Sequence, residues 1–361
     1  MRKYYVDNIR WITVLLVVLY HVIYMYNGVI NAGVIGPFHE VQYQDALQYL
    51  LYPWFMVILF VVSGMSSRYY LENHTVKEFV AGRTRKLLVP STIGLFVFQW
   101  ILGYFNMQMS HAFDTMPNTV PKIAMYFIMV LSGTGVLWYI QVLWILSMVL
   151  AVVRKWEKGK LYRLGEKANP LVLVILGVVV WVFAQILNTP VIVVYRFGIY
   201  GISFFLGYFV FAHESVVERL SKYWHVLAVA AIALGCGYVY YYFGENYAAE
   251  PVVNSPFSIA YGWIAILAIF AGMKRWGDFT SPFAAWMTKK SFGLYVFHYL
   301  PLAAVAYWMK NDTSLSALPS YLIAGVAAYA GGFLLYELIS RIPVIRWCVL
   351  GIKKKEKHVS Q

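Results

Sequence analysis

Arg10 and His21 have the residue types and the spacing to act together on a bound substrate. They are eleven residues apart, and on an α-helix that separation returns the side chain to within about 20° of its starting direction, roughly 16 Å further along. Asp7 precedes Arg10 by three residues, a spacing at which opposite charges on a helix meet. An arginine can bind an anion, and a neutral histidine can accept a proton. The structural alternative is that Arg10 anchors a membrane helix and His21 only contacts a neighbouring helix.

A second group of polar residues lies in a later apolar segment. Ser291, Tyr295 and His298 follow one another at i, i+4 and i+7, which places them on one face of a helix. A polar stripe within a membrane segment faces the interior of the helix bundle and not the lipid. His298 therefore joins Arg10 and His21 as a candidate catalytic residue.

Basic residues cluster beside two other apolar segments. Arg83 and Lys86 precede one segment, and Arg68 ends another that contains Ser63 and Gly64. Guanidinium forks and an ammonium group could hold the phosphates of a nucleotide-bearing donor. Anchoring of membrane segments by basic residues explains the same cluster without any function. The small residues Ser63 and Gly64 allow the close approach of either a neighbouring helix or a ligand.

Aromatic and polar residues at the opposite boundary could contact a sugar. Trp138, Tyr139 and Gln141 follow a stretch that contains glycine, and Arg196 lies early in a further apolar segment. An interfacial aromatic belt explains Trp138 and Tyr139 equally well, and a side chain that reaches back to water explains Arg196.

The composition excludes a soluble globular domain. Hydrophobic residues make up 61% of the chain and charged residues 12%, and the mean hydropathy is +0.63, which indicates an integral membrane protein. Cys236 and Cys348 lie far apart, so neither a metal site nor a disulfide framework is expected, and no nucleic-acid partner is expected. No small-residue cleavage site follows the first apolar segment, which should therefore remain as a helix.

Ten segments are near the length that an α-helix needs to cross a bilayer. The expected fold is an all-α, polytopic membrane helix bundle of about ten transmembrane helices. The ten segments are residues 11–30, 47–66, 87–106, 136–153, 170–188, 191–212, 224–243, 257–273, 291–309 and 321–342.

The distribution of basic residues predicts the orientation of these spans. With a cytoplasmic N-terminus, all 29 lysines and arginines except Lys122, Arg196 and Lys310 lie at the cytoplasmic ends. This asymmetry places both the N- and C-termini in the cytoplasm. The loops are too short for a soluble domain, so residues 1–345 should form a single transmembrane domain. Residues 346–361 should form a basic cytoplasmic tail that touches anionic lipid.

Taken together, these motifs resemble the integral-membrane acyltransferase family 3. The resemblance covers essentially the whole chain, and its most specific part is the Arg10-x10-His21 element. The family's basic pair is commonly Arg-x-x-Arg, whereas Lys86 takes the second place here, and its His-Leu-Trp-Phe-like motif lacks the histidine. The other matching motifs are the Ser63-Gly64 end of the second span, Arg83-x2-Lys86, Val136-Leu137-Trp138-Tyr139 and Ser291-x3-Tyr295-x2-His298.

The resemblance implies an O-acyltransferase that moves an acetyl or succinyl group from a cytoplasmic acyl-CoA to a hydroxyl of a sugar or cell-envelope glycan at the outer face. No metal is expected to take part. His21 would act as general base or, in a variant that stays open, as a nucleophile that carries the acyl group. The donor phosphates would be bound by Arg10, Arg83, Lys86 and Arg68. The acceptor would be bound by Trp138, Tyr139, Gln141, Tyr295 and Arg196.

Such a protein would be a multi-pass protein of a bacterial-type cytoplasmic membrane. Its partners would be membrane lipids, acyl-CoA and the glycan acceptor. Homo-oligomerisation is possible. The alternative function is a non-catalytic transporter or flippase for a glycan or a lipid-linked sugar, which would also need a buried arginine and histidine. The sequence shows no clear inverted halves of the kind that many transporters have. Binding of coenzyme A from the cytoplasm distinguishes the two functions.

Overall fold

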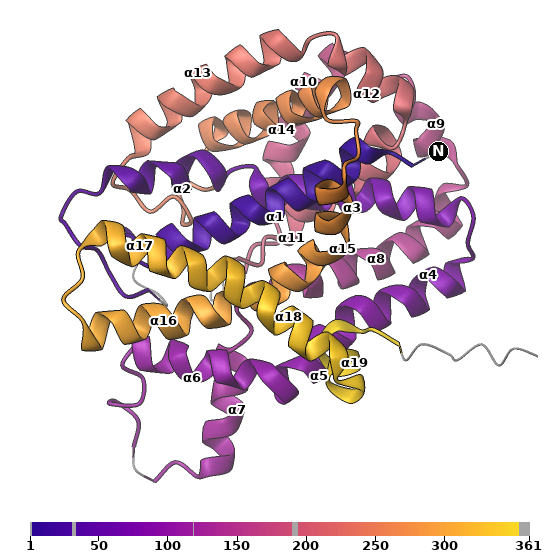
Figure 1. The fold of residues 1–361 in the computed structure, drawn as a ribbon. Helices are drawn as coiled ribbons and strands as arrows, with labels where there is room; N and C mark the ends of the chain where they lie inside the picture. The colour runs from indigo at the N-terminus through magenta and orange to yellow at the C-terminus, as the bar shows by residue number, and fades with distance from the viewer. Residues whose placement is uncertain (1, 31–33, 118, 190–193, 354–361) are drawn as a thin grey trace, which may run out of the picture. The chain divides into compact units, whose positions relative to one another are not determined.

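The structure is a computed structural model that describes residues 2–30, 34–117, 119–189 and 194–353. Its regular structure is helical (Figure 1), and the described residues contain no β-strand beyond an isolated antiparallel bridge between Asn188 and Arg196. The predicted all-α fold is therefore confirmed.

The α-helices are α1 (Tyr4–Tyr24), α2 (Ala46–Leu51), α3 (Phe55–Leu71), α4 (Val76–Arg83), α5 (Val89–Gly94), α6 (Trp100–Met109), α7 (Lys122–Ser132), α8 (Trp138–Glu157), α9 (Lys160–Gly165), α10 (Pro170–Ala184), α11 (Phe197–Leu206), α12 (Glu214–Ser221), α13 (Trp224–Tyr242), α14 (Pro256–Trp276), α15 (Pro282–Phe297), α16 (Tyr299–Asp312), α17 (Ala317–Val326), α18 (Gly332–Arg341) and α19 (Pro343–Leu350). The 3-10 segments are η1 (Tyr43–Asp45) and η4 (Gly135–Leu137). The π-helical turns are η2 (Thr84–Leu88), η3 (Leu95–Gln99), η5 (Gly207–Phe211) and η6 (Ala327–Gly331).

Several of these helices join into stretches that can cross a membrane. Among the described residues, seven stretches are long and apolar enough, and the number rises to nine if each of two bent helix pairs is one span. The protein is therefore a multi-pass membrane protein, while the predicted number of ten spans is not confirmed. The seven stretches are Tyr4–Tyr24, Tyr43–Leu71, Val76–Met109, Gly135–Glu157, Trp224–Tyr242, Pro256–Trp276 and Ala317–Arg341. The bent pairs are Phe197–Phe211 with Glu214–Ser221, at 93°, and Pro282–Phe297 with Tyr299–Asp312, at 48°.

The boundaries differ from the predicted ones where polar residues or bends interrupt a simple apolar run. Helix α1 begins at Tyr4 and not at residue 11, so Asp7 and Arg10 lie inside it. Helix α10 has 15 residues, about 22 Å, which is shorter than a bilayer core. The predicted span 291–309 contains the bend between α15 and α16, with His298 at the bend.

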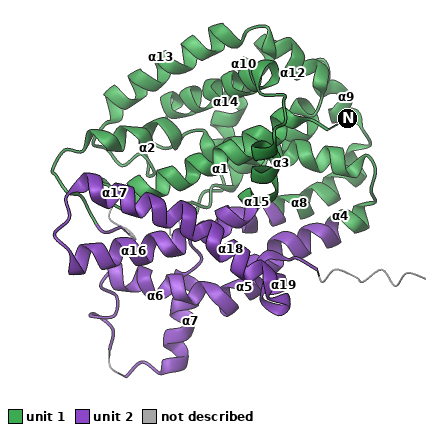
Figure 2. Cartoon of the chain, in the orientation of Figure 1, with its two compact units in different colours: residues 1–31, 36–79, 145–291 green, residues 32–35, 80–144, 292–361 purple. Residues whose placement is uncertain are grey.

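The chain forms two compact units (Figure 2). Unit 1 consists of Met1–Asn31, Gly36–Phe79 and Ile145–Ser291, and unit 2 of Ala32–Ile35, Val80–Trp144 and Phe292–Gln361. The boundaries fall within α4, near the start of α8 and within α15, so each unit is assembled from segments that are distant in sequence.

Helix α3 is the buried centre of unit 1. It packs so closely on α11 and η5 that a Cβ added at Gly64 would lie 2.0 Å from the carbonyl oxygen of Phe204, and one at Gly207 would lie 2.0 Å from that of Val61. Only glycine allows this distance between two backbones. A neighbouring helix therefore occupies the approach beside Gly64, which supports the packing interpretation of this position over the ligand one.

Unit 2 has a similar close glycine contact between α6 and α7. A Cβ added at Gly103 would lie 1.7 Å from the carbonyl oxygen of Met129.

The C-terminal segment of unit 2 contains a helix where the sequence predicted a tail. Residues 346–350 of that predicted tail belong to α19, and Cys348 and Leu350 are buried. Residues 354–361 of that tail lie outside the described residues.

Candidate active site

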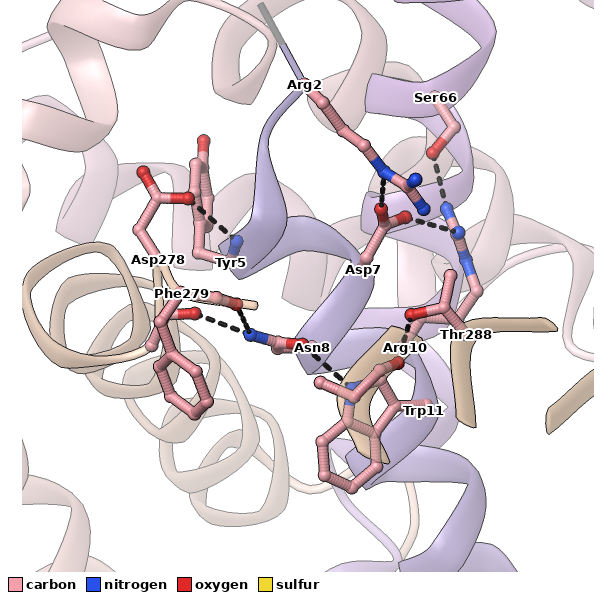
Figure 3. A network of polar contacts seen from close by, with 12 residues as sticks. Arg2, Tyr5, Asp7, Asn8, Arg10, Trp11, Ser66, Asp278, Phe279 and Thr288 are labelled. Carbon is pink, nitrogen blue, oxygen red and sulfur yellow. Dashed lines mark hydrogen bonds and ion pairs between the residues drawn. The ribbon is translucent and has the colours of Figure 1, made fainter. Parts of the chain in front are cut away.

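Arg10 is held from two sides at the start of α1 (Figure 3). Its Nη1 lies 3.3 Å from Oδ1 of Asp7, and its Nη2 donates to Oγ of Ser66 at 2.6 Å. The second oxygen of Asp7 accepts from Nε of Arg2 at 2.7 Å. About a third (35%) of the Arg10 side chain remains exposed. The guanidinium is therefore fixed in orientation and still accessible to an anion.

The backbone around Arg10 is fixed by a loop that follows α14. The side-chain amide of Asn8 donates to the carbonyl oxygens of Gly277 and Phe279 at 2.7 and 2.8 Å. The backbone N–H of Tyr5, one of the N–H groups that a helix start leaves without an internal partner, donates to Asp278 at 3.1 Å. These contacts explain why α1 begins at Tyr4 although polar residues interrupt its apolar run.

His21 lies on the same helix among tyrosines. Its ring lies edge-on to those of Tyr20 and Tyr24, with centroids 5.2 and 6.3 Å away. The Tyr20 hydroxyl lies 3.2 Å from that of Tyr247, which donates to Gln48 at 2.9 Å. Burial raises the pKa of Tyr247 well above its ordinary value, so this phenol stays protonated and can act as a donor. The surroundings of His21 are thus aromatic and carry hydroxyl groups.

Arg196 lies at the start of α11 and is 5% exposed. Its Nη2 donates to the side-chain oxygen of Asn254 at 2.7 Å and to the carbonyl oxygen of Val253 at 3.2 Å. Asn254 in turn donates to Glu250 at 2.5 Å. Arg196 therefore binds the segment before α14 and does not extend to the surface as a lipid-interface arginine would.

Arg68 is part of a stack at the end of α3. Its Cζ lies 3.6 Å from the ring centroid of Tyr162, and the opposite face of that ring stacks on His213 at 3.8 Å. Nε of Arg68 also donates to Glu72 at 3.3 Å. These contacts give Arg68 a role in holding the segment around α9, beside the predicted contact with the donor.

Unit 2 brings three predicted residues together around the bend at His298. The ring of Tyr295 lies 5.6 Å from that of Tyr139 and 6.3 Å from that of His298. The Tyr295 hydroxyl donates to the carbonyl oxygen of Val136. His298 is fully buried, and its Nδ1 lies 3.1 and 2.9 Å from the carbonyl oxygens of Leu294 and Tyr295, which only an Nδ1–H can satisfy. The bend thus fixes the tautomer of His298 as well as its position.

The basic pair Arg83 and Lys86 lies inside the helical stretch Val76–Met109 and not before its start. The local turn η2 is π-helical and is tied to α8 by a hydrogen bond of 3.1 Å from Nε1 of Trp144 to the Thr84 hydroxyl. Gln141, predicted to bind the acceptor, donates to the carbonyl oxygen of Ser91 at 3.0 Å. Trp138 starts α8 with its ring 6.4 Å from that of Tyr139.

The predicted site residues divide between the two units. Unit 1 contains Arg10, His21, Arg68 and Arg196, and unit 2 contains Arg83, Lys86, Trp138, Tyr139, Gln141, Tyr295 and His298. Among the described residues, no group of three or more His, Cys, Asp and Glu side chains could hold a metal ion. Sequence reasoning missed Ser66 and Asn8, which support Arg10, because their partners are distant in sequence.

Comparison with known families decides the class of the protein. The family model of the acyltransferase domain of acyltransferase family 3 matches residues 3–337. The chain belongs to this family. Neither the comparison with curated proteins nor the comparison with solved structures gives a match. Membership in acyltransferase family 3 confirms the resemblance and makes the chain a membrane protein with an acyltransferase domain.

Proposed function

We propose that the protein transfers an acetyl or succinyl group from acyl-CoA to a hydroxyl of a sugar or cell-envelope glycan. The observation that carries the proposal is the pair on α1, a guanidinium held by Asp7 and Ser66 and a histidine on the same helix. Arg10 can bind an anion near the start of α1, and His21 can accept a proton further along the same helix. This arrangement matches acyl-CoA, which has phosphates at one end and a thioester at the other.

The proposed orientation places both termini in the cytoplasm of a bacterial-type cell. It is supported by the distribution of basic residues. The seven long stretches, the two bent pairs and α10, the longer of two short apolar helices among the described residues, together would make ten crossings. An even number returns the C-terminus to the side of the N-terminus. A helix of about 22 Å can cross where the bilayer thins locally.

In the proposed reaction, Arg10, Arg83 and Lys86 bind the donor phosphates and His21 removes the proton of the attacking hydroxyl. The hydroxyl oxygen then bonds to the thioester carbonyl carbon. As the carbon–sulfur bond breaks, coenzyme A leaves as a thiolate and takes up a proton. A variant with the same balance first places the acyl group on the His21 ring and then passes it to the hydroxyl.

The acceptor side of the proposal uses the aromatic residues. Trp138, Tyr139 and Tyr295 offer ring faces and a hydroxyl to a sugar, and His298 sets the position of Tyr295 through the bend. Arg196, whose guanidinium donates to Asn254, keeps its proposed role as an acceptor-binding residue.

The test is transfer by the purified protein in lipid vesicles. Supplied with isotope-labelled acetyl-CoA or succinyl-CoA on one side and an envelope glycan extract on the other, it should release free coenzyme A and add the labelled mass to a glycan. Movement of unmodified glycan across the membrane without consumption of the thioester would instead support the transporter function.

A further inference from the structure

The last described residues of the chain pack against η2, the turn in unit 2 that contains Arg85 and Lys86. We use "C-terminal hook" for residues 343–352, which contain α19 and the turn after it. Gly351 closes the helix with φ +62°, its N–H donates to the carbonyl oxygen of Trp347 at 3.0 Å, and that of Ile352 donates to Arg346 at 3.3 Å. This is the left-handed ending that glycine favours.

Close contacts fix the C-terminal hook on η2 and α5, and Figure 1 shows α19 beside α5. A Cβ added at Gly351 would lie 2.2 Å from the carbonyl oxygen of Arg85 and 3.0 Å from Cα of Lys86. One added at Gly94 would lie 3.1 Å from the carbonyl oxygen of Cys348. Two glycines at two points of contact hold the hook in one position. Arg346 belongs to this fixed segment, because its carbonyl oxygen accepts from Ile352, the residue next to Gly351.

The cations gathered here have few partners. Nε of Arg85 and Nε of Arg346 are each buried and have no hydrogen-bond partner among the described residues. Among the described residues, the rest of the Arg346 guanidinium makes a single hydrogen bond, a long one of 3.5 Å from Nη1 to the carbonyl oxygen of Ser340. No described carboxylate forms an ion pair with Arg85, Lys86 or Arg346.

Buried guanidinium N–H groups without acceptors are costly, and three cations without an anion repel one another. An anion with several acceptor oxygens removes both costs, and arginine forks match the geometry of phosphate. The π-helical turn η2 is also of a kind that often occurs at functional positions.

We propose that the C-terminal hook and the turn at Arg85 and Lys86 form a binding site for a phosphate group, with Arg346 and Arg85 as its principal donors. Arg346 and the hook lie beyond residue 337, where the family match ends. The hook therefore adds residues from outside the family match to Arg85 and Lys86, which lie within it. Its phosphate can come from coenzyme A, in which case the site extends the proposed donor site, or from the headgroup of an anionic lipid.

The test compares purified wild type with Arg346→Gln and Arg85→Gln, each in nanodiscs of phosphatidylcholine. Calorimetric titrations measure the affinity of each protein for coenzyme A and for 3′-dephospho-coenzyme A. In parallel samples, the nanodiscs contain phosphatidylglycerol, and the amount of this anionic lipid that stays bound to the purified protein is measured. Arg275→Gln, which removes an exposed arginine from the end of α14 in unit 1, is the control for net charge.

If coenzyme A supplies the phosphate, each of the two variants should bind it about tenfold more weakly, as expected for one lost charge-assisted contact. The preference for coenzyme A over its dephospho form should also shrink if the 3′-phosphate is the group bound. If lipid supplies the phosphate, affinity for coenzyme A should stay constant and the variants should retain less phosphatidylglycerol. Wild-type values for both ligands in both variants would overturn the proposal.

A glycine pair tests the role of the hook itself. Gly351→Ala would place a methyl group against the Arg85 carbonyl and strain the backbone, so a folded variant should lose binding as Arg346→Gln does. Gly325→Ala in α17, with no atom within 4 Å of the added Cβ, should bind as wild type. A folded Gly351→Ala protein with wild-type binding would contradict the site. A wild-type protein that binds no coenzyme A would count against the proposed function alone.

Discussion

Asp7 Oδ1 lies 3.3 Å from Nη1 of Arg10, one turn earlier on α1. The other terminal nitrogen of Arg10 donates to Ser66 at 2.6 Å, and the hydroxyl proton of Ser66 goes to the carbonyl oxygen of Val62 at 2.8 Å. Because that proton is used, Ser66 can only accept from Arg10. Acceptors from α1 and α3 therefore set the direction of the Arg10 guanidinium, which explains how a partly exposed arginine can be oriented before a donor binds.

The first prediction removes one of these acceptors. Ser66→Ala should raise the KM for acyl-CoA several-fold with little change in kcat, because Arg10 loses its fixed direction while His21 is unaffected. Steady-state kinetics in detergent or vesicles measure both constants. Ser67→Ala is the matched control, since that neighbouring hydroxyl donates to the carbonyl oxygen of Ser63 at 2.7 Å. Equal KM values for the two variants would show that Ser66 does not position Arg10.

A second prediction concerns the contact between α3 and α11. Gly64→Ala should lower the free energy of unfolding by about 1–3 kcal/mol or more, the usual cost of overpacking. The reason is that the added Cβ would lie 2.0 Å from a backbone oxygen. Gly272→Ala in α14, where no atom lies within 4 Å, should leave the thermal midpoint within a degree or two, roughly the effect of a surface change. Similar midpoints for both variants would mean that the helices do not approach so closely.

The helical class and the membrane location could be predicted from the sequence because both depend on long apolar runs. Seven predicted spans correspond to continuous helical stretches. The predicted and observed boundaries differ where polar residues or bends occur. Helix α1 extends back through Asp7 and Arg10 because residues 277–279 accept hydrogen bonds from its first turns. The bend at His298 is not visible in the apolar pattern, which continues through it. Its signal is Pro301, which lacks the N–H that a continuous helix would need there.

The candidate site could be predicted only as far as local spacing reaches. The i, i+3 pair of Asp7 and Arg10 follows from helix geometry and is present. The contact of Arg10 with Ser66 and the stack of Arg68 on Tyr162 join segments far apart in the chain, and no spacing rule connects them. The placement of Arg196 against Asn254 likewise depends on how α11 meets the segment before α14.

A third prediction concerns Arg68. Arg68→Gln should loosen the segment around α9, because it removes the cation from the face of Tyr162, an interaction of about 0.5–2 kcal/mol. Limited trypsin digestion should then cleave at Lys158 and Lys160 faster than in wild type. Tyr162→Leu should produce the same change, as both variants break one stack. Unchanged cleavage together with weakened donor binding would assign Arg68 to the donor site instead.

A fourth prediction tests the orientation of the membrane spans. In a chain with Cys236 and Cys348 replaced by alanine, a cysteine at Asp114 should react with a membrane-impermeant thiol reagent in intact cells. A cysteine at Lys160 should react only after the membrane is opened, because the basic residues around it favour the cytoplasm. Both original side chains are exposed, so accessibility within the protein does not limit the reaction. Labelling of position 160 in sealed cells would place the proposed donor site on the wrong side.

The most direct test of the account is the effect of His21→Ala on acyl transfer. Wild-type protein in vesicles, supplied with labelled acyl-CoA and glycan acceptor, should release coenzyme A and acylate the glycan. His21→Ala should bind coenzyme A with wild-type affinity and lose transfer by at least about a hundredfold, the contribution typical of a general base. A variant that is folded, binds the donor and transfers at the wild-type rate would contradict the assignment of His21 as the group that activates the acceptor.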